Sequence, residues 1–208
     1  MKPLLIGLTG GVGVGKSSVA ALLKEHGAQI VSGDELGKLA LEQSPPALAA
    51  VRSRFGPGVF TSDGKLLRRE LGKRVFSSKE AARWLTELTF PRIHELWQEA
   101  VRCSTSDALV LDASLILEWG IEDEFDLLVV VEAAEDIARQ RMAASGRLTM
   151  EEAVERRNVQ VEAKRKAESA DAIIKNNGSL DELRSQVNEF WSHTIMPKLE
   201  RRKFNQHD

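Results

Sequence analysis

The stretch from Gly10 to Ser18 has the residue types and the spacing of a phosphate-binding loop. It reads Gly-Gly-Val-Gly-Val-Gly-Lys-Ser-Ser and fits the pattern G-x-x-x-x-G-K-[ST] from Gly10 to Ser17. Glycines let backbone N–H groups turn inward around phosphate oxygens, because glycine alone adopts a positive φ at little cost. In this pattern the lysine reaches the β- and γ-phosphates and the hydroxyl is a ligand of Mg²⁺. The stretch therefore predicts that Lys16 and Ser17 hold a nucleoside triphosphate and its metal ion.

The residues on either side of this loop predict the elements that position it. Residues 4–8 form a short apolar run typical of a buried strand, and residues 18–24 have the pattern of a helix. A helix that starts here adds the positive end of its dipole to the phosphate site. This order of strand, loop and helix argues against the alternative of a glycine-rich turn with a chance lysine. The predicted ATP-binding residues of the loop are Gly11, Val12, Gly13, Val14, Gly15, Lys16, Ser17 and Ser18.

Two aspartates follow predicted strands and are further candidates for chemistry. Asp34 comes after the strand predicted at residues 28–32, and Asp112 ends the apolar run 108–112. In open α/β sheets the carboxyl ends of the strands face the ligand, so both can lie in one crevice. Asp112 has the form of a Walker B residue, which binds Mg²⁺ directly or through water. For Asp34, position alone leaves two roles open, a catalytic residue or only the N-cap of the helix predicted at residues 35–42.

The bulk composition is ordinary for a soluble globular protein. With 208 residues the chain is long enough for one α/β domain with an insertion. The net charge of −2 predicts no general attraction to nucleic acid or to anionic membranes. The single cysteine cannot form an internal disulfide and suits a reducing cytoplasm, and no apolar run approaches the roughly 18 residues of a membrane helix. The first strand begins directly after Met1-Lys2-Pro3, which predicts no signal peptide. Nothing in the sequence indicates the oligomeric state.

The remaining pattern predicts a parallel sheet with helices on both faces. Further strands are predicted at 125–132 and 171–175, which makes five strands alternating with helices. Residues 44–105 lack a strand signal and predict helices at 47–55, 68–76, 78–88 and 91–102, and a last helix is predicted at 179–203. The eight basic residues between Arg139 and Lys166 are typical of a solvated helix face. In a P-loop kinase this place in the chain instead forms a basic lid over the triphosphate.

Over nearly its whole length the chain resembles the dephospho-CoA kinase family, which is similar in fold to the nucleotide monophosphate kinases. The order and spacing of the matches carry the resemblance, since no match beyond the P-loop is decisive alone. In the first half the matching residues are Leu8-Thr9-Gly10-Gly11, Gly33-Asp34, Phe55-Gly56, Asp63-Gly64, Leu66, Arg68, Leu71, Val75-Phe76 and Pro91. In the second half they are Leu115-Ile116, Glu118, Arg141, Gln160, Lys164 and the stretch Ala170-Asp171-x-Ile173-Ile174-x-Asn176-Asn177-Gly178.

The resemblance implies a three-layer P-loop kinase fold with a five-stranded parallel sheet, a helical insertion that binds the acceptor, and a small basic lid. It implies a single chain with a core of residues 1–34, 106–140 and 168–208, the insertion at 35–105 and the lid at 141–167. The implied reaction transfers the γ-phosphoryl group of ATP, with Mg²⁺, to the ribose 3′-hydroxyl of dephospho-CoA. In it Asp34 is the base, Lys16 and Arg141 bind phosphates, and Asn176 and Asn177 lie near adenine. The implied acceptor-binding residues are Asp34, Arg68, Phe90, Leu115 and Glu118, and the implied metal ligands are Ser17 and Asp112.

Several positions depart from the family pattern. The family usually has Asp at Ser32, His at Phe90, Pro at Ser114, Arg at Ser145 and Thr at Ser18. These departures concern the acceptor and the lid more than the nucleotide, so they leave alternatives open. One is a P-loop kinase of another small-molecule hydroxyl, such as a nucleoside, and the other is a nucleotide-binding paralogue without transfer activity. Retention of Lys16, Asp34, Asp112 and Arg141 favours the kinase, because a pure binder needs no base.

Overall fold

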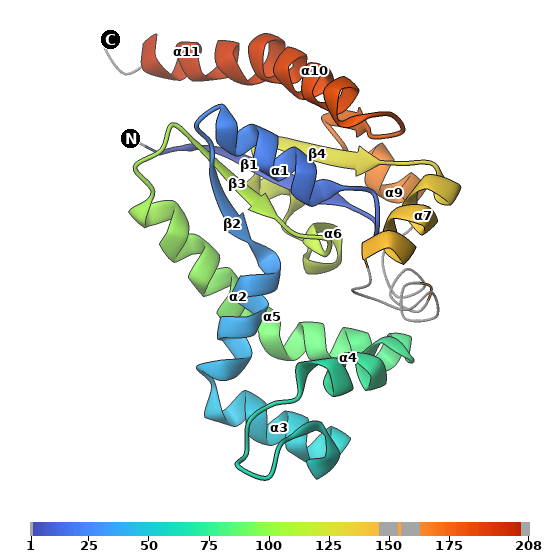
Figure 1. Ribbon diagram of the computed structural model, residues 1–208. Coiled ribbons are helices and arrows are strands. Elements are labelled where there is room, and N and C mark those ends of the chain that lie inside the picture. The colour runs from blue at the N-terminus through green and yellow to red at the C-terminus, as the bar shows by residue number, and fades with distance from the viewer. Residues whose placement is uncertain (1, 146–153, 155–162, 205–208) are drawn as a thin grey trace.

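The centre of the molecule is a parallel β-sheet. The computed structural model describes residues 2–145, 154 and 163–204. Within them five parallel strands pair in the order β2-β3-β1-β4-β5 (Figure 1). The strands are β1 (Leu4–Gly10), β2 (Gln29–Ser32), β3 (Ala108–Asp112), β4 (Leu127–Glu132) and β5 (Ala172–Lys175). The predicted five-stranded parallel sheet is confirmed, and the strand that leads into the glycine loop lies at its middle.

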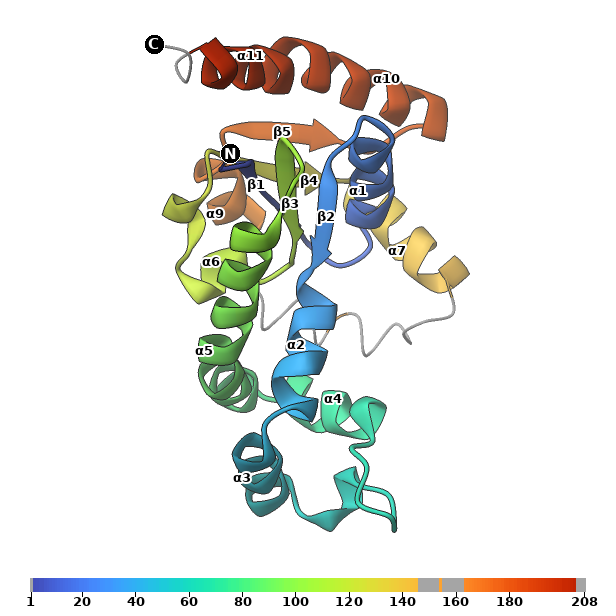
Figure 2. The ribbon, with the colours of Figure 1, turned by 90° about the vertical axis from the view of Figure 1, so that its left-hand side faces the viewer.

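Helices cover both faces of this sheet, which makes three layers (Figures 1 and 2). One face carries α1 (Lys16–Glu25), α10 (Leu180–Phe190), the π-helical turn η3 (Trp191–Ile195) and α11 (Met196–Phe204). The other face carries α2 (Gly33–Glu42), α5 (Lys79–Cys103) and the short α6 (Ile116–Trp119). Two more helices, α7 (Glu135–Ser145) and α9 (Ala163–Glu168), lie between β4 and β5 in the chain. The short 3₁₀ turn η2 (Glu122–Glu124) precedes β4.

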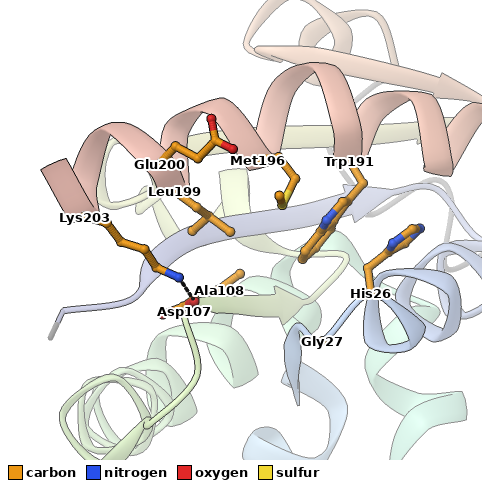
Figure 3. A pocket seen from close by; sticks show the side chains of 9 residues that line it. All are labelled: His26, Gly27, Asp107, Ala108, Trp191, Met196, Leu199, Glu200 and Lys203. Atoms are coloured by element: carbon orange, nitrogen blue, oxygen red, sulfur yellow. Dashed lines mark hydrogen bonds and ion pairs between the residues drawn. The ribbon is translucent and has the colours of Figure 1, made fainter.

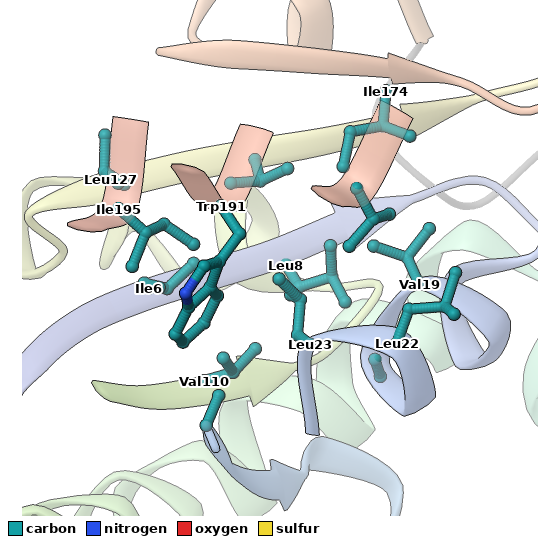
Figure 4. Close-up of a cluster of buried hydrophobic side chains, with 14 of the residues drawn as sticks. Ile6, Leu8, Val19, Leu22, Leu23, Val110, Leu127, Ile174, Trp191 and Ile195 are labelled. Carbon is teal, nitrogen blue, oxygen red and sulfur yellow. The ribbon is translucent and has the colours of Figure 1, made fainter. Parts of the chain in front are cut away.

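Alternating strand residues supply the two hydrophobic layers. In β1, Leu4, Ile6 and Leu8 pack with the α1 and α10 side, whereas Leu5 packs with the α5 side. Figure 4 shows the first of these layers, in which Trp191 of η3 lies among aliphatic side chains of the sheet and α1. Because both faces are covered, the strands are apolar at nearly every position, as expected for a parallel sheet.

A third hydrophobic cluster lies in the helical part between β2 and β3. It joins the end of α2 with α3 (Pro45–Phe55), the 3₁₀ turn η1 (Pro57–Val59) and α4 (Arg68–Phe76). Its buried members are Leu41, Ala47, Val51, Val59, Phe60, Leu71 and Val75. The helices predicted at 47–55 and 68–76 are confirmed, and Figure 2 shows this part extending below the sheet.

The structure corrects the prediction of two helices at 78–88 and 91–102. They are one helix, α5, with Pro91 inside it. A proline inside a helix removes one N–H from the hydrogen-bond ladder and its ring crowds the preceding turn, but Ile93 and Trp97 after it are buried in the same layer. Tertiary packing therefore outweighs the local signal for a helix end at Pro91.

Most of the predicted lid at 141–167 lies outside the described residues, and so does the match at Gln160. Of Ser145, where the sequence departs from the family pattern, only the backbone is described, at the end of α7. The division into core, insertion and lid stays a prediction. Within the part of the chain that the structure describes, every helix is too short or too polar to cross a bilayer.

Candidate active site

The glycine loop has a backbone conformation that only glycine tolerates. Gly13 and Gly15 have φ values of +81° and +91°, and α1 starts directly after Gly15. A Cβ on Gly13 would lie 2.6 Å from the carbonyl oxygen of Ala138 in α7, and one on Gly15 would lie 2.2 Å from Nδ2 of Asn176. The loop is thus held between α7 and the segment after β5, and the N-terminus of α1 opens beside it. This is the geometry that binds phosphate oxygens.

Lys16 and Asp112 meet at the carboxyl ends of β1 and β3. The Lys16 Nζ atom lies 3.8 Å from Oδ1 of Asp112, and both side chains are largely buried, at 17% and 19% exposure. Burial raises the pKa of Asp112, the charge of Lys16 opposes this rise, and the nearby carboxylate of Asp34 adds to it. The strand ends therefore bring a lysine and two aspartates together next to the glycine loop.

Asp34 does not cap α2. The N-cap is Ser32, whose hydroxyl accepts a hydrogen bond from the backbone N–H of Glu35 at 3.3 Å. Asp34 lies in the first turn of the helix and is exposed. Of the two roles that the sequence left open for Asp34, the N-cap is excluded, because α2 begins one residue before it.

Gly33 sets the distance between the start of α2 and the end of β3. A Cβ at this position would lie 2.5 Å from Cβ of Ala113 and 3.2 Å from the carbonyl oxygen of Asp112. Only glycine permits so close an approach at this point. It places Asp34 within electrostatic range of Asp112, and the sequence contained the Gly-Asp pair without revealing this constraint.

Arg141 and Asn176 brace the glycine loop from the other side. The Asn176 side chain is buried and donates to the carbonyl oxygen of Val14 at 2.9 Å, while its Oδ1 accepts from Arg141 at 3.2 Å. Arg141 also donates to the carbonyl oxygen of Asn176 at 2.8 Å. The Oδ1 atom of Asn177 accepts from the backbone N–H of Ala134 at 2.7 Å. The structure thus places Asn176 and Arg141 against the loop and Asn177 against the backbone before α7, and the contacts of all three with the nucleotide stay predictions.

The predicted acceptor-binding residues occupy different elements on the other side of the crevice. Arg68 starts α4 and pairs with Glu42 of α2 at 3.3 Å. The Phe90 ring of α5 stacks on Trp119 of α6, with centroids 6.0 Å apart and planes inclined by 26°. Leu115 is the N-cap of α6, and the carboxylate of Glu118 in that helix faces a buried lysine. An aromatic contact thus fills the place at which the resemblance to the family leads us to expect a histidine.

That buried lysine is Lys166 of α9, which sequence reasoning did not select. Its Nζ lies 3.5 Å from Oε1 of Glu118 and donates to the carbonyl oxygen of Ser114 at 2.5 Å. In the sequence it is one of eight basic residues in a run, and the run is typical of a solvated face. The burial arises from contacts with a segment far away in the chain, so no local signal distinguishes Lys166.

The oxygen donors near the loop fit a magnesium ion. Mg²⁺ binds through one or two carboxylates together with substrate phosphates and water, and it prefers hard oxygen ligands. Ser17 is exposed at the start of α1, and Asp112 supplies a carboxylate at the adjacent strand end. Among the described residues, no group of three or more His, Cys, Asp or Glu gathers to hold a metal ion alone. This donor set suits an ion that arrives with the nucleotide.

A separate pocket of about 270 Å³ lies at the end of the sheet where the strands begin, opposite to the glycine loop (Figure 3). Its lining includes the start of β3, the turn at Gly27, and Trp191 and Leu199 from the C-terminal helices. Trp191 is already stacked on His26, with ring centroids 5.0 Å apart. Because the glycine loop is at the carboxyl ends of the strands, this pocket does not belong to the phosphate site.

The glycine loop between a central parallel strand and its helix, with charged residues at the neighbouring strand ends, is typical of the P-loop nucleotide-binding proteins, to which P-loop kinases belong. The family model for dephospho-CoA kinase matches residues 4–182. The dephospho-CoA kinase of Syntrophotalea carbinolica is 37% identical over 187 residues, covering 88% of this chain and 89% of that protein. That of Chlorobaculum tepidum is 36% identical over 200 residues, covering 93% and 96%. The chain belongs to the dephospho-CoA kinase family, and it is a phosphotransferase with a hydroxyl acceptor.

Solved structures show the same architecture. A crystal structure from Thermus thermophilus superposes with a TM-score of 0.78 at 28% identity, covering 93% of this chain and 99% of that one. The dephospho-CoA kinase of Campylobacter jejuni has a TM-score of 0.65 at 24% identity, with 91% and 96% covered. The shikimate kinase of Bacteroides thetaiotaomicron has a TM-score of 0.51 at 13% identity, with 91% and 97% covered. The last two likenesses confirm the P-loop kinase fold.

Proposed function

We propose that this protein transfers the γ-phosphoryl group of ATP to the ribose 3′-hydroxyl of dephospho-CoA, which yields coenzyme A and ADP. The observation that carries the proposal is the meeting of Lys16, Asp112 and Asp34 beside the glycine loop, in a chain of this family. A nucleotide-binding module without transfer activity has no use for a second carboxylate at this place.

The chemistry requires positioning and charge stabilisation more than covalent help from the protein. The backbone N–H groups of the glycine loop and Lys16 bind the phosphates, and Arg141 adds positive charge beside them. Asp34 accepts the proton of the 3′-hydroxyl as that oxygen forms its bond to the γ-phosphorus. The bond from the γ-phosphorus to the β,γ-bridging oxygen breaks, and ADP leaves with that oxygen.

Magnesium belongs to this proposal as a companion of ATP. Ser17 and Asp112 are the residues that would hold it, and when bound it neutralises charge on the phosphates. The partners of the protein in this function are the two small-molecule substrates, with no nucleic acid and no membrane. A cytoplasmic location fits these substrates.

The proposed acceptor-side residues are Asp34, Arg68, Phe90, Leu115 and Glu118. Of these, Phe90 is the residue that supports an alternative acceptor. Its packing against Trp119 gives an apolar surface where the family usually has histidine, which favours a different hydroxyl acceptor as second candidate. The departure at Ser32 has a local function, since this residue caps α2.

The test is ADP release by the purified protein with ATP and a panel of acceptors, comprising dephospho-CoA, nucleosides and small alcohols. We expect release that depends on dephospho-CoA, and phosphorus NMR of the product should show a new 3′-phosphomonoester. The Phe90→His variant, measured on the same panel, should keep this preference. Release with a nucleoside but not with dephospho-CoA would establish the alternative acceptor, and binding of ATP without release on any acceptor would contradict the proposal.

A further inference from the structure

Lys166 is a buried cation that the proposed phosphoryl transfer does not use. Its side chain is only 2% exposed, and among the described residues it makes polar contacts with the carboxylate of Glu118 and the carbonyl oxygen of Ser114. Both contacts belong to the segment that follows β3, whereas Lys166 lies on α9, 52 residues further along the chain for the Ser114 contact. The residue therefore joins α9 to one short piece of backbone.

That piece of backbone connects the two halves of the active site. It begins at Asp112, which faces Lys16, and continues through Ala113, against which Gly33 packs. It ends at Trp119, which stacks on Phe90 of α5. A shift of this segment would change the distance between the phosphate-binding residues and the helices that carry the predicted acceptor contacts.

A charge in this place is a poor choice for stability alone. Removing an ammonium and a carboxylate from water costs several kcal/mol per ion, and apolar residues of similar volume often stabilise a protein as well or better. Burial lowers the pKa of Lys166, the carboxylate of Glu118 opposes this, and the charge of Lys16 lowers it further. Two ammonium groups that influence each other at one end of the sheet are typical of a functional site.

We propose that Lys166 is a positioning residue for the acceptor substrate, which it affects by holding the segment Ser114–Glu118 in place. The Nζ donor fixes the backbone at Ser114, and the ion pair fixes α6 through Glu118. This inference rests on the proposed function, because it concerns the acceptor of that reaction. It assigns to Lys166 no contact with either substrate.

The test compares Lys166→Met with Lys175→Met, the same change at an exposed position of β5. Steady-state kinetics are measured with ATP and with dephospho-CoA as the varied substrate. A displacement of about 1 Å can cost about 10²-fold in rate, so we expect kcat/KM for dephospho-CoA to fall about 10- to 100-fold in Lys166→Met. The KM for ATP should change less than about threefold, as in the Lys175→Met control, because Asn176 and α7 hold the glycine loop in place.

Loss of folding is separated from loss of positioning by a double-mutant cycle. Lys166→Met leaves the Glu118 charge buried without this partner, so Lys166→Met with Glu118→Gln should recover most of the lost Tm. The acceptor kcat/KM of the double variant should not rise above that of Lys166→Met, since neither methionine nor glutamine restores the bond to Ser114 and Glu118 is itself a proposed acceptor-side residue. Recovery of Tm and kcat/KM together would overturn the proposal.

Two further outcomes complete the test. Unchanged acceptor kinetics in Lys166→Met, or an equal loss for ATP, would also overturn the role of Lys166. Wild-type protein that fails to phosphorylate dephospho-CoA would instead refute the proposed function, and the wild-type assay in the same series reveals this.

Discussion

Ser32 and Asp34, two residues apart at the end of β2, have different tasks. Ser32 satisfies the backbone N–H of Glu35 and so ends the strand and starts α2. Asp34 makes no contribution to the cap, and its carboxylate instead acts on Asp112 across the crevice. Because Ser32 already caps the helix, the proposed catalytic role of Asp34 can be tested without removing the cap.

Asp34→Asn should lower the single-turnover rate of phosphoryl transfer at saturating ATP by at least about 10²-fold, since general-base help is worth about 10²–10⁴. The Tm and the affinity for ATP should stay at wild-type values. Ser32→Ala is the matched control, which should lose about 1 kcal/mol of stability and keep the transfer step. A wild-type rate in Asp34→Asn would remove the base from the mechanism.

Lys166 should make stability depend on pH in a defined direction. Because its pKa in the folded protein is lowered from 10.5, the unfolded chain binds this proton up to a higher pH than the folded chain does. The free energy of unfolding of the wild type, relative to Lys166→Met at the same pH, should therefore increase from the lowered pKa up toward 10.5. Urea unfolding of both proteins from neutral pH to about pH 10 checks this. A difference that is constant or that decreases over this window would show that Lys166 is not desolvated.

At the scale of elements, α2 contains two glycines in different surroundings. A Cβ on Gly33 would lie 2.5 Å from Cβ of Ala113, whereas one on Gly37 would make an ordinary contact of 3.8 Å with Ile93. The first glycine is required by the approach of α2 to the end of β3. The second occupies a helix interior, where glycine is less favourable than alanine.

Gly33→Ala should destabilise the protein by about 1–3 kcal/mol, the range for overpacking, and should lower kcat because Asp34 moves with the backbone. Gly37→Ala should leave kcat unchanged and stabilise by up to about 1 kcal/mol. Urea unfolding and steady-state kinetics of the two variants give the comparison. Equal behaviour of both variants would mean that the approach at Gly33 does not position Asp34.

At the scale of the whole molecule, the glycine loop is a junction between distant segments. The central strand leads into it, α7 packs on it at Gly13, and Asn176 after β5 holds it at Val14. A ligand that binds this loop therefore binds only the folded chain and should stabilise the entire sheet.

ATP at about 100 times its Kd should raise the free energy of unfolding by about 2.7 kcal/mol through mass action. Lys16→Ala should lose most of this stabilisation at the same ATP concentration, because the β- and γ-phosphates lose a charged partner. Lys24→Ala, at an exposed position of the same helix, should keep it. Thermal unfolding with and without ATP measures the effect, and an equal shift in all three proteins would contradict the role of Lys16.

The sequence by itself determined the glycine loop, the five strands and the helices α3 and α4, because these signals are local. A residue pattern of eight positions identifies the loop, and runs of apolar residues identify strands that are covered on both faces. The resemblance to one family added an expected role for Asp34. Each of these inferences depends on residues close together in the chain or on their order along it.

The tertiary structure decided what depends on segments far apart. Pro91 predicts a helix end, but burial of the residues after it keeps α5 continuous. Asn176 supports the loop from a position 162 residues after Val14, and the buried Lys166 finds its polar contacts in the segment after β3, at Ser114 and Glu118. Burial and charge pairing between such segments arise when the sheet brings them together, so a residue's type and its chain neighbours do not contain this information.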